Sequence, residues 1–203
     1  MTMSDDGYVT LKGLANRLKL FKMFFDQTAA ETFKLKENEL ITPLTPYKKR
    51  IKFRVLEFDE LIDSSNINHH HQIEIAKTIE KNYSKYDGFV VCHGTDTLAY
   101  TSSILSFMLE NLQKTVVVTG SQIPIEELRN DAQDNLLGAL LVAGHFVIPE
   151  VTVYFNDKLY RGNRVSKVSS NKLEAFNTPN IHPLGNFNVS FELHWDKILH
   201  VPG

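Results

Sequence analysis

Short apolar runs alternate along this chain with longer amphipathic stretches. Two runs, Gly-Phe-Val-Val-Cys at residues 88–92 and Thr-Val-Val-Val-Thr at residues 115–119, are continuously apolar or β-branched, and residues 151–155 form a third. Runs of this length are typical of parallel strands that are buried on both faces. Apolar residues at helical spacing predict helices over residues 71–86, 98–112 and 128–143.

This alternation of strands and helices predicts an α/β fold. Its expected form is a doubly wound, mostly parallel sheet with helices on both faces, because parallel strands need crossover helices between them. Residues 52–58 alternate between polar and apolar side chains and predict the first strand. We expect one domain over residues 1–203.

The two ends of the chain carry weaker patterns. Leu14, Leu18, Phe21 and Phe25 predict one amphipathic helix near the beginning. The pattern weakens beyond Arg161, where we expect a loop-rich segment, with one or two edge strands within residues 188–201.

Charge and cysteine content narrow the class of partner. Lys and Arg number 22 against 24 Asp and Glu, so no global basic field favours nucleic acid or an anionic membrane surface. The one cysteine cannot form an intrachain disulfide, and no apolar run suits an export signal or a membrane span. We expect a soluble, cytoplasmic protein that binds a small molecule.

Polar residues follow three of the predicted strands. These loops are Asp-Ser-Ser at residues 63–65, His-Gly-Thr-Asp-Thr at residues 93–97 and Thr-Gly-Ser-Gln at residues 119–122. Any one loop could be a helix cap or a turn. Ligands of parallel sheets, however, bind beyond the carboxyl ends of the strands, so the three loops together favour a polar small-molecule site.

Lys167 adds a possible base to these loops. Alone it would be read as a solvated lysine, but a threonine hydroxyl such as that of Thr95 needs a base to become a nucleophile. A lysine can serve when burial or nearby charge holds its amine neutral, and Asp96 could orient the pair.

Two histidine features carry less weight. His69, His70 and His71 could form a metal tract, but no other ligand lies at suitable spacing, so we interpret them as a solvated loop and expect no metal. His93 is read as a hydrogen-bonded imidazole rather than an acid or base.

Residues 93–97, 119–122 and 160–164 together resemble the N-terminal domain of type I, cytoplasmic L-asparaginases. The resemblance runs from about Gly7 to Pro183. It implies hydrolysis of L-asparagine to L-aspartate and ammonia through an acyl-enzyme on a threonine, without metal or cofactor, in a homo-oligomeric full-length form.

The resemblance also implies roles for residues that would bind the substrate. Asp63, Ser64 and Ser65 match the loop that holds its α-amino and carboxylate groups, and Asp96 matches the carboxylate that binds its ammonium. Ser121 matches a position whose backbone carbonyl orients the substrate amide.

Further roles implied by the resemblance concern catalysis and closure of the site. Thr95, Asp96 and Lys167 match the family's threonine, aspartate and lysine triad, which activates water or the nucleophile. Tyr8 matches the tyrosine of the flexible loop that closes over the site.

The sequence departs from the family pattern at both ends. The family's Thr-Gly-Gly-Thr strand, with the acylated threonine, is expected before Tyr8, and a smaller second domain is expected after Gly203. We therefore expect residues 1–203 alone to have little or no activity. Two alternatives remain: a catalytically silent amino-acid-binding or subunit-interaction module, and, at lower rank, an amidase subunit for transamidation of glutamyl-tRNA.

Overall fold

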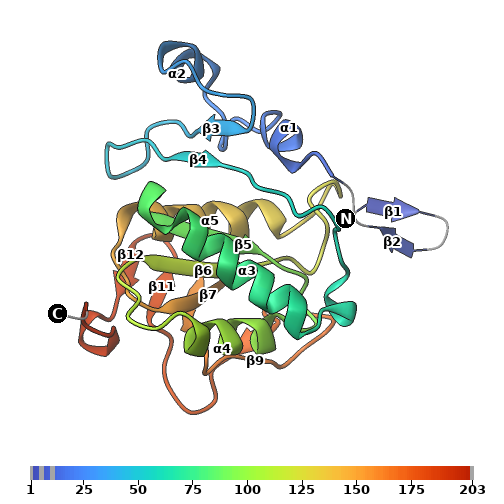
Figure 1. The fold of residues 1–203 in the computed structure, drawn as a ribbon, viewed down its shortest axis with the longest axis vertical. Helices are drawn as coiled ribbons and strands as arrows, with labels where there is room; N and C mark the ends of the chain where they lie inside the picture. Colours follow the sequence, from blue (N-terminus) through green and yellow to red (C-terminus); the bar gives the residue numbers. More distant parts are fainter. Residues whose placement is uncertain (1, 5–6, 10–11, 202–203) are drawn as a thin grey trace. The chain divides into compact units, whose positions relative to one another are not determined.

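A computed structural model describes residues 2–4, 7–9 and 12–201 of the chain (Figure 1). It divides into two compact units, Met1–Ile62 and Asp63–Gly203. The expectation of one domain over residues 1–203 stays a prediction beside this division.

The first unit contains short elements only. Its strands form two antiparallel pairs, β1 with β2 and β3 with β4. The elements are β1 (Thr2–Ser4), β2 (Gly7–Val9), α1 (Leu14–Leu18), α2 (Gln27–Thr32), β3 (Glu39–Ile41) and β4 (Lys52–Arg54).

Two predictions for this unit are wrong. The helix expected over residues 14–25 ends at Leu18. Beyond it the amides of Leu20 and Phe21 donate to carbonyls three residues back, so the chain continues in tight turns instead of an α-helix. The strand expected over residues 52–58 covers Lys52–Arg54 and pairs with β3, so it does not begin the parallel sheet.

The second unit is built on a six-stranded sheet in the order β12-β11-β8-β7-β6-β5. Its helical elements are η1 (Ser64–Asn66), α3 (His69–Asn82), η2 (Tyr83–Lys85), α4 (Leu98–Met108), α5 (Ala132–His145) and η3 (Trp195–Lys197). Its strands are β5 (Gly88–Cys92), β6 (Thr115–Thr119), β7 (Val151–Phe155), β8 (Lys158–Arg161), β9 (Ser166–Lys167), β10 (Phe176–Asn177), β11 (Gly185–Phe187) and β12 (Phe191–Leu193).

The predicted α/β class is confirmed, and the three central strands have the predicted bounds. Each of the three helices overlaps its predicted range and departs from it by four residues at one end. The sheet is mixed rather than mostly parallel. Strands β5, β6 and β7 are parallel, whereas β8, β11 and β12 join by antiparallel pairs. The reason is that the chain returns after β7 through hairpins, which join antiparallel strands.

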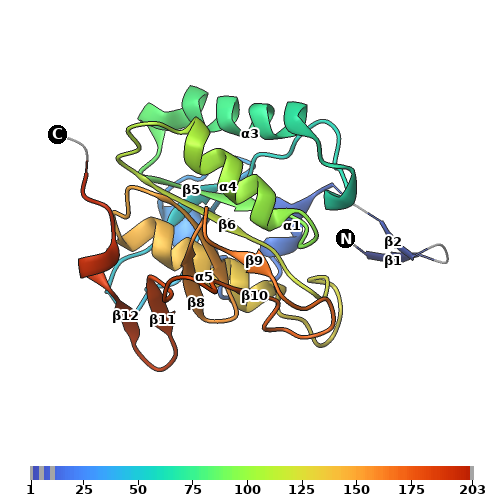
Figure 2. The ribbon, with the colours of Figure 1, turned by 90° about the horizontal axis from the view of Figure 1, so that it is seen from below.

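Helices cover both faces of this sheet, as predicted. Figure 2 shows α3 and α4 on one face and α5 on the other. Strands β6 and β7 are buried along their whole length, but β5 is only partly buried because it lies at the end of the strand order in the described part of the chain.

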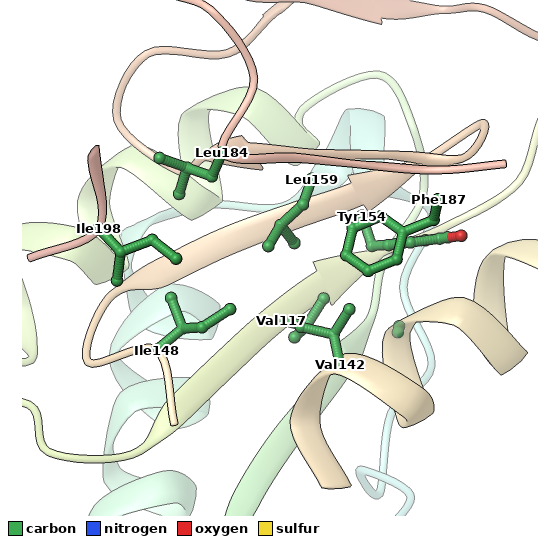
Figure 3. Packing of buried hydrophobic residues seen from close by; sticks show 9 residues of the cluster. Val117, Val142, Ile148, Tyr154, Leu159, Leu184, Phe187 and Ile198 are labelled. Atoms are coloured by element: carbon green, nitrogen blue, oxygen red, sulfur yellow. The ribbon is translucent and has the colours of Figure 1, made fainter. Parts of the chain in front are cut away.

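The main apolar cluster lies against α5. Figure 3 shows its side chains coming from β6, β7, β8, β11, α5 and the segments around Ile148, Leu184 and Ile198. Its members are Val117, Ala139, Val142, Ile148, Tyr154, Leu159, Leu184, Phe187 and Ile198. Full burial of each large aliphatic side chain contributes about 1.5–3 kcal/mol, so this cluster fixes α5 against the strands.

Candidate functional site

The ends of β5 and β6 bring two of the polar loops side by side. The two strands pair in register from Gly88 with Thr115 to Cys92 with Thr119, and the His93 amide then donates to the Thr119 carbonyl at 2.8 Å. A Cβ on Gly120 would lie 2.2 Å from the His93 carbonyl oxygen. Only glycine permits this close approach of the loops.

Lys167 meets the loop after β5. Its Nζ donates to Thr95 Oγ1 at 2.8 Å and forms an ion pair with Asp96 Oδ1 at 2.7 Å. The Lys167 side chain is 18% exposed and that of Asp96 is 60% exposed. The cluster therefore brings together a hydroxyl, an amine and a carboxylate, and the carboxylate is the more exposed to solvent of the two charged groups.

Residues 63–65 reach the same loop from another direction. Asp63 accepts hydrogen bonds from the amide and the hydroxyl of Ser65, both at 2.9 Å. Ser64 is buried, its carbonyl accepts from the Thr97 hydroxyl at 2.7 Å, and a Cβ on Gly94 would lie 2.5 Å from Ser64 Oγ. Thr97 occupies the N-cap position of α4, but its hydroxyl serves this contact instead of the helix.

The path of the chain to these residues differs from the expected one. Asp63 precedes η1 and does not follow a strand of the six-stranded sheet, because β4 belongs to a separate pair. Lys167 likewise lies within β9, which pairs with β10. The loops after β5 and β6 do follow neighbouring strands, whereas residues 63–65 and Lys167 reach them through side-chain and backbone contacts.

Ser121 lies in the loop after β6, which two side chains of α5 hold. Asp131 Oδ2 accepts from the Gln122 amide at 3.0 Å, and Asp131 Oδ1 accepts from the Ile123 amide at 2.9 Å. Asn135 Nδ2 donates to the Gly120 carbonyl at 3.0 Å. Neither contact could be predicted from the sequence, because an aspartate just before a helix has the pattern of an ordinary N-cap.

Tyr8 belongs to the first unit. Its backbone pairs with Met3 in the β1–β2 hairpin, and its side chain lies outside the described part of the chain. Its role at the site stays a prediction.

His93 is the buried histidine of this region. Its Nδ1 donates to the Gly94 carbonyl at 2.7 Å, and among the described residues its Nε2 has no hydrogen-bond partner. Burial lowers the pKa of His93, while the bond to Gly94 partly raises it. Burial therefore favours the neutral ring, and the contact with Gly94 agrees with the reading of His93 as a hydrogen-bonded imidazole.

His69, His70 and His71 form the first turn of α3 instead of the expected loop. The Asn68 side chain accepts from the His70 amide at 2.9 Å, and His71 Nδ1 accepts from the Asn68 amide at 3.1 Å, which together cap α3. Within residues 2–4, 7–9 and 12–201, no cluster of three or more His, Cys, Asp or Glu side chains is arranged to hold a metal ion. No helix in this same part of the chain is long and apolar enough to cross a membrane.

The fold and this cluster define an α/β domain whose loops join a hydroxyl, an amine and a carboxylate. The family model described as asparaginase, N-terminal, matches residues 23–199. The chain therefore belongs to the asparaginase family.

Individual relatives are similar over different shares of their length. A 60 kDa lysophospholipase from Mus musculus is 50% identical over 198 residues, which are 97% of this chain and 35% of that protein. L-asparaginase 1 from Escherichia coli K12 is 54% identical over 132 residues, 65% of this chain and 39% of that protein. The chain thus spans little more than a third of the length of these relatives.

A solved structure agrees with the fold. L-asparaginase I from Vibrio cholerae matches with a TM-score of 0.70 and 50% identity, covering 73% of this chain and 45% of that one. This likeness bears out the assignment to an α/β asparaginase N-terminal fold.

Proposed function

We propose that this chain is part of an amidohydrolase that converts L-asparagine to L-aspartate and ammonia. A threonine hydroxyl adds to the side-chain amide carbon, and the carbon–nitrogen bond breaks as the nitrogen leaves as ammonia with the proton of that hydroxyl. Water then hydrolyses the resulting ester, which releases L-aspartate and returns a proton to the threonine. The contact of Lys167 Nζ with both Thr95 Oγ1 and Asp96 Oδ1 is the observation that carries this proposal.

In this proposal, Thr95 and Lys167 transfer protons and Asp96 binds the substrate. Thr95 and Lys167 exchange a proton along their 2.8 Å hydrogen bond and activate water or a nucleophilic hydroxyl. Asp96 orients Lys167, and its exposed side binds the α-ammonium of the substrate.

The neighbouring loops complete the proposed pocket. Asp63, Ser64 and Ser65 hold the α-amino and carboxylate groups, the Ser121 carbonyl orients the amide, and Tyr8 closes the site. The proposed enzyme needs no metal or cofactor, acts in the cytoplasm and assembles as a homo-oligomer in its full-length form.

The binding step gives the first test, because it does not require turnover. Asp96→Asn removes the charge opposite the α-ammonium at constant size. A charge-assisted hydrogen bond is worth about 1.5–3 kcal/mol, so the Kd for L-aspartate should rise roughly 10- to 100-fold by calorimetry.

Asp87→Asn is the matched control, since exposed Asp87 lies just before β5, at the opposite end of that strand from Asp96. Equal affinity of the two variants would refute the proposed role of Asp96.

Turnover separates the candidate activities. Ammonia release from L-asparagine and L-glutamine should be assayed on both the 203-residue chain and the full-length protein. A lysophospholipid should be included as substrate, because the 50% identical mouse relative is named a lysophospholipase. Aspartate binding without hydrolysis in either form would favour the silent amino-acid-binding module instead.

A further inference from the structure

The first turn of α5 carries two buried polar side chains that the proposed chemistry does not use. Asp131 is 9% exposed and Asn135 is 2% exposed. Four residues apart on a helix, they face the same side. Asp131 occupies the N-cap position of α5, yet its side chain makes no capping hydrogen bond to the helix.

Both carboxylate oxygens of Asp131 instead accept from the loop after β6. Oδ2 accepts from the Gln122 amide at 3.0 Å and Oδ1 from the Ile123 amide at 2.9 Å. A buried carboxylate with two amide donors forms charge-assisted bonds, which are stronger than neutral ones. The carboxylate thus fixes the two peptide groups that follow Ser121.

Asn135 fixes the peptide on the other side of Ser121. Its Nδ2 donates to the Gly120 carbonyl at 3.0 Å and to Asp131 Oδ2 at 3.1 Å. Its Oδ1 accepts from the Asn156 amide at 2.9 Å. Every polar atom position of this side chain is therefore used to tie the loop, the helix and the β7–β8 turn together.

The same loop is joined to the segment that carries the lysine. Gln122 Nε2 donates to the Lys172 carbonyl at 3.0 Å, and Lys172 lies between β9 and β10, the hairpin that contains Lys167. A path of hydrogen bonds thus runs from Asp131 through Gln122 to the hairpin of Lys167.

We propose that Asp131 and Asn135 are positioning residues of the candidate site. They hold the Ser121 carbonyl and, through Gln122, the Lys167 hairpin in the arrangement that binds the substrate amide. This inference rests on the proposed amidohydrolase function, and neither residue is assigned a contact with substrate.

Asp131→Asn in the full-length protein tests the inference. The asparagine side chain has the same size but only one acceptor oxygen, so one of the two loop amides would face another donor. Asp134→Asn is the control, because Asp134 is exposed in the same turn of α5 and its loss removes the same charge.

Two readouts are needed. Hydrogen exchange of the Gln122 and Ile123 amides should accelerate at least tenfold in Asp131→Asn and stay unchanged in Asp134→Asn. For ammonia release from L-asparagine, KM should rise at least tenfold in Asp131→Asn with a smaller change in kcat, because a misplaced loop weakens amide binding first.

The possible outcomes test the positioning role separately from the proposed amidohydrolase function. Unchanged exchange at both amides, or an unchanged KM in an active Asp131→Asn variant, would overturn the positioning role. If exchange accelerates in Asp131→Asn only at this loop, while the wild-type protein neither binds aspartate nor releases ammonia, Asp131 orders the loop and the amidohydrolase proposal is refuted.

Discussion

His93 illustrates how one residue can shape the site without taking part in its chemistry. Its ring is buried and donates to the carbonyl of Gly94, the residue that must approach Ser64 closely. A neutral imidazole suits this place, because a buried charge without a partner is costly. The lowered pKa of His93, caused mainly by burial, gives this arrangement a pH dependence.

We predict that His93→Asn flattens the pH dependence of stability. An unfolded histidine takes up a proton near pH 6.5, whereas folded His93 does so only at lower pH. The unfolded state therefore binds more protons as the pH falls below 6.5, and the wild type loses up to about 1.4 kcal/mol per pH unit there.

Asparagine keeps a donor for Gly94 but does not titrate. Urea denaturation of both proteins from pH 7.5 to 5.5 should therefore give converging free energies of unfolding as the pH falls. Parallel curves would show that His93 does not contribute to the acid sensitivity.

Single residues also show how much of the site the sequence could reveal. The resemblance to the asparaginases implied that Thr95, Asp96 and Lys167 act together, and the structure brings the three side chains into contact. Asp131 and Asn135 could not be found this way. Their function lies in contacts with the loop of residues 120–123, and a helix-start aspartate gives no sign of such contacts.

At the level of elements, the strands predicted from continuous apolar runs have the correct bounds. The strand that was not predicted follows a tight turn. Strands β5, β6 and β7 match their predicted ranges. Strand β8 was not predicted, although Asn156 and Asp157 before it both have positive φ angles, of 48° and 57°. Two such residues form the mirror-image turn that suits hairpins, and an Asn-Asp pair tolerates it. This turn makes the second half of the sheet antiparallel.

The turn predicts opposite effects for two substitutions at Asn156. Asn156→Val should destabilise the protein by about 1–2 kcal/mol, because a β-branched residue is strained at positive φ. Asn156→Gly should leave the free energy of unfolding unchanged or raise it slightly, since glycine adopts this conformation freely. Chemical denaturation measures both, and equal stability of the two variants would contradict the assigned turn.

At the scale of the whole second unit, an ion pair between buried Glu150 and half-buried Arg161 holds the last segment against the sheet. Arg161 contacts Glu150 through Nε at 2.6 Å and Nη2 at 3.0 Å, and it also donates to the Lys197 carbonyl. Glu150 accepts in addition from the Leu199 amide at 2.8 Å. The pair thereby joins the start of β7, the end of β8 and the segment around η3.

Glu150→Ala should cost about 2–3 kcal/mol of stability, less than for a fully buried pair, because the Arg161 left behind keeps some contact with solvent. Thermal and urea denaturation can be compared with Glu110→Ala, an exposed position where a change below about 0.5 kcal/mol is expected. Replacing Glu150 and Arg161 together with methionine should recover most of the loss. A loss of less than about 0.5 kcal/mol in Glu150→Ala would show that the ion pair does not stabilise the last segment against the sheet.

The hydrogen bond between Lys167 and Thr95 joins positions that are 72 residues apart, and this separation affects the order in which the protein folds. Closing long stretches of chain is entropically costly and slows folding, whereas hairpins such as β7–β8 form between near neighbours. We expect refolding chains to regain their circular dichroism before they regain affinity for aspartate. A newly made chain would then pass through a stage in which it has its sheet but cannot yet recognise a ligand.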